Sequence, residues 1–167
     1  MLLHTNRLYL RPLSPFDAPA FRNLNADPEV LRYTGDLPFA DLRAAENFLS
    51  DYDQYRLYGV GRLAVIDKEG EAFLGWCGLK YTAARAEYDL GFRFFKKYWN
   101  QGYATEAARA VLHWGFTDKN LSEIIGRAAV ANPASLRVLE KIGMTRRRTI
   151  DFAGMPGVLY SIVNPQK

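Results

Sequence analysis

The order of the elements in the middle of the chain constrains the fold more than any other feature. Residues 87–95 and 121–130 are predicted to be strands, and residues 102–117 between them follow the three-and-four spacing of a helix. A helix that joins two strands of one sheet makes them parallel, and such crossovers are right-handed. The sequence therefore predicts an α/β fold in which one parallel crossover interrupts a mostly antiparallel sheet flanked by helices.

The remaining elements are predicted from local signals. Ser14, Pro15 and Asp17 resemble a capping box at a helix start, and Asp27 with Pro28 opens a short helix. The other expected elements are a strand at residues 7–11, one amphipathic helix from 41 to 59, a hairpin of 61–67 and 72–81, a helix at 132–143, and strands at 145–152 and 158–163 around a turn at 153–157. No repeat or linker interrupts this order, so residues 1–167 are predicted to form one domain.

Composition narrows the class of protein. With 49% hydrophobic and 24% charged residues, the chain suits a compact globular domain. No signal-peptide pattern or membrane-length apolar run is present, so we expect a cytoplasmic protein without a membrane partner. The single cysteine, Cys77, lies in an apolar run and is predicted to be a small buried hydrophobe. One cysteine and two histidines exclude an internal disulfide and a Cys/His zinc site, and we predict no metal.

Charge indicates the kind of ligand. The net charge of +4 favours anionic ligands in general. The only basic run, residues 146–148, is too short for a nucleic-acid arm, and direct nucleic-acid binding is not predicted. His113 shares a polar helix face with Glu106 and Arg109, so we expect it to be solvated and not catalytic.

The start of the crossover helix is the strongest candidate binding site. The stretch Asn100 to Ala107, NQGYATEA, places Gly102 and Ala104 where a strand-to-helix loop leaves unpaired backbone N–H groups at a positive helix terminus. Two such small residues let a phosphate approach the backbone closely. Neither a Walker motif nor a G-x-G-x-x-G motif is present, which argues against P-loop and Rossmann chemistry.

Three groups of residues carry a family resemblance. They are Asp89 to Phe94, Tyr98 to Ala107, and Asn132 to Ser135 with Val138 and Glu140 to Met144. Together they resemble the GNAT N-acetyltransferases, in particular the RimJ/RimL-like branch that acetylates ribosomal-protein N-termini. Residues 5–13 and 33–35 also look like that branch, so the resemblance covers nearly the whole chain. Trp99 departs from the family pattern, which often has Gln or Arg there.

The resemblance implies that acetyl-CoA is the co-substrate and lies across the middle of the sheet. The pantetheine arm is expected along the backbone of the strand that carries Phe92, Arg93 and Phe94, like an added strand. The pyrophosphate is expected on the loop that contains Asn100, Gln101, Gly102, Tyr103, Ala104 and Thr105. The resemblance also gives the Asn132 side chain to the pantetheine, although Asn132 would equally serve as a helix cap.

The resemblance and the residues together give candidates for the catalytic groups. Similarity to the branch makes Ser135 the group that protonates the departing thiolate, although it would also suit a plain polar position in a first helical turn. A general base for the amine is sought in Asp89 or Asp151, with a water chain as the third option, and Asp89 is preferred because it lies beside the predicted CoA strand. A backbone N–H near Phe92 or Phe94 would polarise the acetyl carbonyl.

Tyr33 and Asp36 are the predicted acceptor-site residues, because loops carry specificity. The resemblance implies direct transfer of acetyl to a primary amine, and the predicted acceptor is a protein or peptide N-terminus. Acid residues at Asp36 and Asp41 would instead favour a polyamine, and a small-molecule antibiotic amine is a further alternative. From another class of protein, a non-catalytic acyl-CoA-binding module would also keep the loop. The sequence leaves monomer and homodimer both open.

Overall fold

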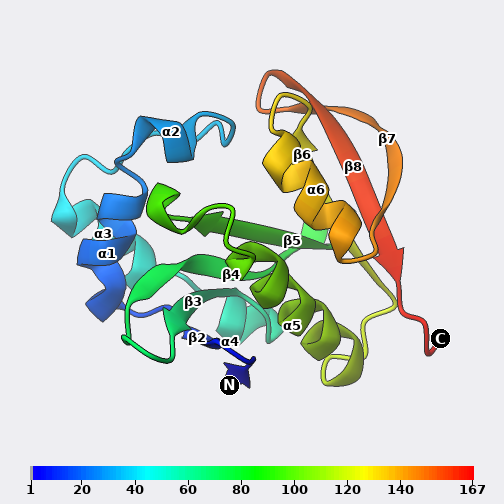
Figure 1. Ribbon diagram of the computed structural model, residues 1–167, viewed down its shortest axis with the longest axis horizontal. Helices are drawn as coiled ribbons and strands as arrows, with labels where there is room; N and C mark the ends of the chain where they lie inside the picture. The colour runs from blue at the N-terminus through cyan, green and yellow to red at the C-terminus, as the bar shows by residue number, and fades with distance from the viewer. Residues whose placement is uncertain (1) are drawn as a thin grey trace.

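The computed structural model describes residues 2–167 and contains one eight-stranded sheet with helices on both faces (Figure 1). The strands are β1 (Leu3–His4), β2 (Leu8–Pro12), β3 (Arg62–Asp67), β4 (Phe73–Thr82), β5 (Glu87–Phe94), β6 (Glu123–Ala129), β7 (Thr145–Phe152) and β8 (Met155–Val163). The helices are α1 (Ala18–Leu24), α2 (Pro28–Leu31), α3 (Leu42–Ser50), α4 (Gln54–Tyr58), α5 (Tyr103–Thr117) and α6 (Pro133–Lys141), with 3₁₀ turns η1 (Pro15–Asp17), η2 (Ala83–Arg85) and η3 (Lys96–Tyr98).

The sheet has the order β1-β2-β3-β4-β5-β6-β8-β7. Every neighbouring pair is antiparallel except β5 and β6, which α5 connects, so the predicted parallel crossover is confirmed. The parallel pairing covers only two positions, Asp89 with Ile125 and Leu90 with Gly126. Beyond Leu90 the remaining residues of β5 pair with β4 alone, which leaves the other edge of β5 open.

Two hydrophobic clusters lie on opposite faces of the sheet, as the alternation along β3 shows. Leu63 and Val65 belong to the cluster that α5 covers, whereas Ala64 and Ile66 belong to the cluster that α1 and α3 cover. Cys77 is fully buried in the first cluster, and burial raises the pKa of its thiol, so the prediction of a small buried hydrophobe is confirmed.

Several predicted elements are confirmed with small changes at their ends. The capping box is present, since the Ser14 N–H donates to Asp17 Oδ2 at 2.8 Å. Arg11 also pairs with Asp17, with Nη2 2.7 Å from Oδ1. The predicted face of α5 packs against the sheet, and His113 is exposed as expected. Among residues 2–167, no helix is long and apolar enough to cross a membrane.

The prediction of one helix from 41 to 59 is wrong, because residues 51–53 break it into α3 and α4. The break turns two phenols toward the sheet. Tyr52 Oη accepts a hydrogen bond from the Arg62 N–H at 2.9 Å, and Tyr55 Oη accepts one from the Leu13 N–H at 2.9 Å. A continuous helix would follow its amphipathic period and give up these contacts. The short strand β1 was not predicted, and β8 begins at Met155, inside the predicted turn.

Candidate active site

Two residues with left-handed backbone conformation shape the loop between β5 and α5. Asn100 has φ of 58° and Gly102 has φ of 82°. Asparagine and glycine tolerate this region better than other residues do. The turn points the chain into α5, and the N–H groups of residues 100–105 donate to no acceptor within residues 2–167. A Cβ at Gly102 would meet only Arg7 Nη2, at 3.4 Å, so this terminus has the free donors and the space that a phosphate needs.

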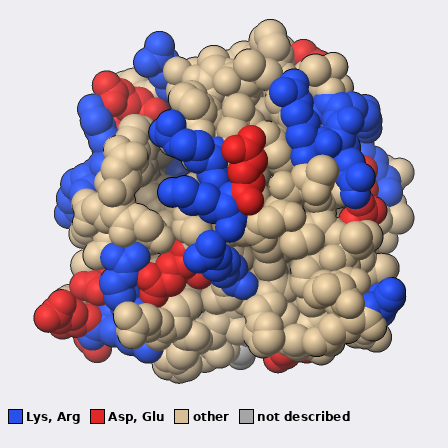
Figure 2. Space-filling view, turned by 45° about the vertical axis from the view of Figure 1, so that its right-hand side comes forward, with Lys and Arg blue, Asp and Glu red and all other residues tan. Residues whose placement is uncertain are grey.

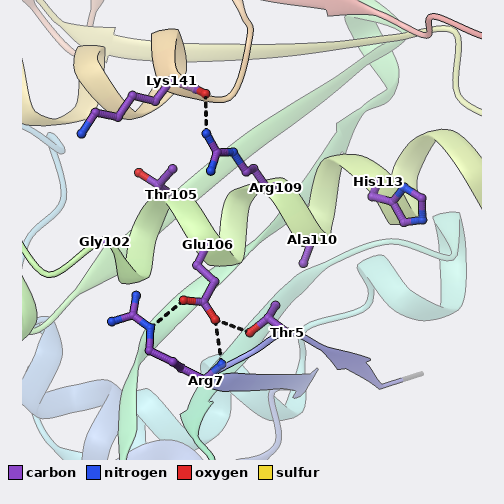
Figure 3. Close-up of a pocket in the computed structure, with 9 residues that line it drawn as sticks. All are labelled: Thr5, Arg7, Gly102, Thr105, Glu106, Arg109, Ala110, His113 and Lys141. Atoms are coloured by element: carbon purple, nitrogen blue, oxygen red, sulfur yellow. Dashed lines mark hydrogen bonds and ion pairs between the residues drawn. The ribbon is translucent and has the colours of Figure 1, made fainter.

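Glu106, in the first turn of α5, is braced by the segment between β1 and β2. Its carboxylate accepts hydrogen bonds from Thr5 Oγ1 at 2.6 Å, the Arg7 N–H at 2.8 Å and Arg7 Nε at 2.7 Å (Figure 3). Burial opposes ionisation of Glu106, but these hydrogen bonds outweigh it and hold its pKa below the ordinary value. Arg7 also donates to the Gln101 carbonyl at 3.0 Å and lies over the Tyr103 ring, so it fixes the loop and offsets the acid beside it.

A hollow of about 680 Å³ opens beside Gly102 along α5. Its lining holds three cations, Arg7, Arg109 and Lys141, and one acid, Glu106. Arg109 is held across the hollow, since its Nη2 donates to the Lys141 carbonyl at 3.0 Å (Figure 3). On the molecular face that Figure 2 shows, Lys and Arg side chains gather across the middle, with Asp and Glu side chains among them. The surroundings of the loop therefore attract anions.

The open edge of β5 presents main-chain groups next to this loop. The Phe95 N–H donates to the Leu74 carbonyl of β4. Main-chain N–H and C=O groups alternate between the two edges of a strand, so those of Arg93 also point to β4. The main-chain groups of Phe92 and Phe94 therefore point to the open edge. Trp99 Nε1 donates to the Phe94 carbonyl at 2.9 Å, which gives the residue that departs from the family pattern a place in the loop. An extended chain could pair with Phe92 as an added strand.

Arg93 differs from the expectation that grouped it with Phe92 and Phe94. Its side chain lies on the opposite face of the sheet from α5, where Nη2 pairs with Asp36 Oδ2 at 2.7 Å and Nη1 donates to Asn25 Oδ1. The predicted acceptor residue Asp36 is therefore engaged with Arg93, while Tyr33 is half-buried under the Arg32 guanidinium. Asp41 is also engaged, since Oδ1 accepts the Ala44 N–H at the start of α3.

Asn132 and Ser135 contact each other at the start of α6. Asn132 Oδ1 accepts the Ser135 N–H at 3.3 Å, which confirms the helix cap. Asn132 Nδ2 donates to Ser135 Oγ at 2.9 Å. Because the serine oxygen accepts here, its own hydrogen stays available for donation to a third group. Leu139, one turn after Ser135 in α6, is buried in the core.

Asp89 lies on the same face as Arg93 and pairs with Arg127 of β6, which also pairs with Glu87 at 2.6 Å. Burial raises the pKa of Asp89 above its ordinary value, and the charge of Arg127 opposes that rise only in part. Asp151, the other candidate base, is exposed on β7, and its Oδ2 accepts the Gly154 N–H at 3.3 Å. β7 lies three strands from β5, so only Asp89 lies beside the open edge.

The loop between α2 and α3 reaches the turn between β7 and β8. A Cβ at Gly35 would lie 2.4 Å from the Ala153 Cβ, so the two segments are in close contact. Gly35 also has φ of 74°, a conformation that glycine adopts at least cost. This contact spans the side on which Tyr33 and Asp36 lie and limits what could reach the open edge of β5 from there.

Comparison with known proteins decides the family. The family model "Acetyltransferase (GNAT) domain" matches residues 7–145. The chain belongs to the GNAT acetyltransferases. It is 31% identical over 167 residues to the uncharacterized N-acetyltransferase p20 of Bacillus licheniformis, covering 96% of this chain and 92% of that one. The crystal structure of a GNAT-family acetyltransferase from Bacillus anthracis superimposes with a TM-score of 0.84 at 28% identity, covering 98% of this chain and 99% of that chain.

Two more distant structures share the fold alone. A ribosomal-protein-S5-alanine acetyltransferase from Vibrio fischeri has a TM-score of 0.84 at 16% identity over 99% of this chain and 97% of that one. A spermidine N-acetyltransferase from Vibrio cholerae, solved with CoA and spermine, has a TM-score of 0.80 at 20% identity over 96% and 97%. The chain is thus an acetyl-CoA-dependent N-acetyltransferase of the GNAT family, and neither structure decides its acceptor.

Sequence reasoning missed two residues of this GNAT site. Arg7 braces Glu106 and the loop, and Arg127 holds Asp89. Arg127 did carry a signal, because it is the one charged residue in the run Ile124 to Ala129 of β6. A lone arginine in an apolar strand indicates a partner acid on a neighbouring strand.

Proposed function

We propose that the enzyme acetylates the α-amine of a peptide or protein N-terminus, as the RimJ/RimL-like branch does, by direct attack within a ternary complex. The observation that carries this proposal is the open edge of β5. On one side it is flanked by the free N–H groups at the start of α5. On the other it is flanked by Asp89, which lies on the face of the sheet opposite α5, called the acceptor face from here on. Donor and acceptor would meet from opposite sides of one strand. No covalent enzyme intermediate is required, and the only cysteine is buried.

On the donor side, the N–H groups of residues 101–105 would hold the pyrophosphate, and Arg109 and Lys141 would offset the charge of the nucleotide. The main chain of Phe92 and the Asn132 side chain would orient the pantetheine arm. The Phe92 N–H would stabilise the acetyl oxygen as negative charge develops there. The N–H groups of the loop fit the co-substrate because they donate to no other acceptor within residues 2–167. The Asn132 side chain does have a partner, but that partner, Ser135, belongs to the same proposed site.

On the acceptor side, Asp89 would accept the proton of the amine, and Ser135 would donate one to the leaving thiolate. A carboxylate with a raised pKa is a stronger base than a solvated one. An α-amine needs little help, since its ordinary pKa is about 7.7–8.0 whereas that of a lysine is about 10.4. Asp89 and Phe92 are three residues apart, about 10 Å along a strand, so we infer that a water relays the proton.

The polyamine alternative loses its sequence argument. Asp36 and Asp41 were the acids that would favour a polyamine, and both are engaged, Asp36 with Arg93 and Asp41 with the α3 backbone. The fold likeness to a spermidine acetyltransferase supports a GNAT fold and nothing more specific.

Thiol release from acetyl-CoA tests the proposal. The purified protein is supplied with acetyl-CoA and, separately, with N-terminal peptides, the same peptides with a blocked N-terminus, lysine side-chain analogues, polyamines and aminoglycosides. We expect release with free N-terminal peptides and little with blocked ones. Turnover of polyamines or aminoglycosides alone would refute the acceptor, and CoA binding without turnover of any amine would favour the non-catalytic module.

A further inference from the structure

Arg62 opens β3 on the acceptor face, beside Trp76 of β4 and Arg93 of β5. Its guanidinium carbon lies 4.5 Å from the centre of the Trp76 ring, and that of Arg93 lies 5.5 Å from the same centre. Burial and the charge of Arg93 hold the pKa of Arg62 below its ordinary value, while Tyr52 and Asp36 act in the opposite direction. The guanidinium groups of Arg62 and Arg93 therefore both lie close to the Trp76 indole, in a partly desolvated part of the acceptor face.

This part of the face has donors without acceptors. Arg93 is satisfied by Asn25 and Asp36. Within residues 2–167, the Arg62 guanidinium has no hydrogen-bonded partner; the charge of Asp36 acts on it, and its side chain is half-buried. The buried Trp76 Nε1 is also without a partner in that part of the chain. Buried polar groups are nearly always hydrogen-bonded, so the unpartnered Trp76 Nε1 indicates a missing acceptor, and the two guanidinium groups beside it favour an anionic one.

The strand register places Arg62 and the reaction site two strands apart on one face of the sheet. Arg62 stands opposite Gly78, and Gly78 stands opposite Gly91 of β5, so the row has no side chain of its own beyond Arg62. The edge of the Trp76 ring lies over Gly91, where a Cβ would be 3.2 Å from Cζ3 and Cη2, so the indole forms the floor of this row. Asp89 is two residues from Gly91 on the same face. With strands about 4.8 Å apart and residues about 3.4 Å apart along a strand, the Cα atoms of Arg62 and Asp89 are roughly 12 Å apart. An acceptor a few bonds long could span this row.

We propose that Arg62, with Trp76 and Arg93 beside it, binds a carboxylate of the acceptor while the amine of the same molecule lies near Asp89. This inference rests on the proposed function and narrows its substrate to amines that carry an acidic group. The carboxylate has two possible sources, the C-terminus of a short peptide or an acidic side chain near a protein N-terminus. A polyamine would bring only positive charge to Arg62 and would be repelled.

The test compares matched acceptors that differ in one charge. Glycylglycine and glycylglycinamide differ at the C-terminal carboxylate. Two amidated tetrapeptides, Ala-Asp-Ala-Ala and Ala-Asn-Ala-Ala, differ only at an acidic side chain, and 1,5-diaminopentane represents a polyamine. Each is titrated calorimetrically into the protein saturated with CoA and is assayed with acetyl-CoA. The variants are Arg62→Met, Arg62→Lys and, as a matched loss of one exposed cation on α1, Arg22→Met.

We expect at least one acidic acceptor to bind about 10- to 100-fold more tightly than its neutral counterpart, as loss of a charge-assisted hydrogen bond predicts. Arg62→Met should remove this preference by raising the KM of the acidic acceptor, with kcat nearly unchanged. Arg62→Lys should retain part of the preference, and Arg22→Met should retain all of it. The member that binds identifies the source of the carboxylate. Equal binding or no binding within both pairs, or a preference for the diamine, would overturn the inference. Acetyl transfer to none of these amines, with acidic peptides still bound preferentially, would count against the proposed function alone.

Discussion

Replacement of Gly102 by valine probes the loop that is proposed to hold the pyrophosphate. The change has two effects that the structure separates. Gly102 has φ of 82°, and a side chain in the left-handed region costs about 1–2 kcal/mol. In a chain of this size, that loss lowers the melting temperature by roughly 2–8 °C. The added methyl groups would also stand in front of the free N–H groups, since nothing else occupies that space except Arg7 Nη2 at 3.4 Å.

The expected loss of CoA affinity follows from those N–H groups. A hydrogen bond to a charged group contributes about 1.5–3 kcal/mol, so losing contact with the phosphate raises Kd about 10- to 150-fold. Isothermal titration of CoA into each variant measures this value. A matched control is Gly154→Val in the turn between β7 and β8, where φ is 79° and an added Cβ would meet no atom within 4 Å. It carries the same backbone strain without touching the loop.

The two variants should therefore lose similar stability and differ in CoA binding. Melting temperatures within a few degrees of each other, with a raised Kd for Gly102→Val only, would support the assignment of the loop. If Gly102→Val bound CoA as tightly as Gly154→Val does, the phosphate would not lie against these amides, and the donor side of the proposed mechanism would have to be abandoned.

Three further predictions address single residues. Ser135→Ala should lower kcat about 100-fold, the lower range for a general acid, and change the Kd of CoA by less than about threefold; equal losses would make Ser135 a binding residue. Asp89→Asn should lower kcat at neutral pH by about 100-fold, while Asp151→Asn does not. In the wild type and in Asp151→Asn, kcat should fall on acidification from a pH above the ordinary carboxylate range, because burial raises the Asp89 pKa, and Asp89→Asn should lack this fall; similar activity of both variants would favour a water chain. Glu106 has a lowered pKa in the fold, so its stabilisation is present above its unfolded pKa and is lost as pH falls through the folded value; urea unfolding between pH 7 and 3 should show a smaller acid-induced loss for Glu106→Gln, and an unchanged loss would contradict the brace.

The elements that the sequence predicted correctly are those with strong local signals. Helix α5 buries the alanine face that its spacing indicated, and Ser14 and Asn132 cap as their types suggest. The wrong prediction, one helix from 41 to 59, shows the limit of periodicity. The pattern stays helical through Tyr52 and Tyr55, but both phenols reach backbone groups of other elements, and no helical period contains that information.

Charged residues within strands mark a second limit. Arg62, Arg93 and Arg127 each stand among apolar neighbours, and the sequence can show only that such a residue is unusual. Its partner is set by the register of strands that lie far apart in the chain, such as Asp89 opposite Ile125 and Trp76 opposite Arg93. The acceptor face therefore emerges only from the paired sheet, whereas the phosphate loop is a local turn that its own sequence encodes.

Strand β5 can contact the acetyl donor and the acceptor at once, because its side chains alternate between the two faces of the sheet while its main-chain groups alternate between the two edges of the strand. Side chains alternate between faces, so Asp89 and Arg93 point to the acceptor side while Leu90 and Phe94 enter the core under α5. Main-chain groups alternate between edges, so those of Phe92 face the opening toward β6. The opening exists because pairing with β6 stops after Leu90. A substitution that extended this pairing would close the donor edge without altering any of the side chains assigned to catalysis, so the length of the parallel ladder itself is part of the site.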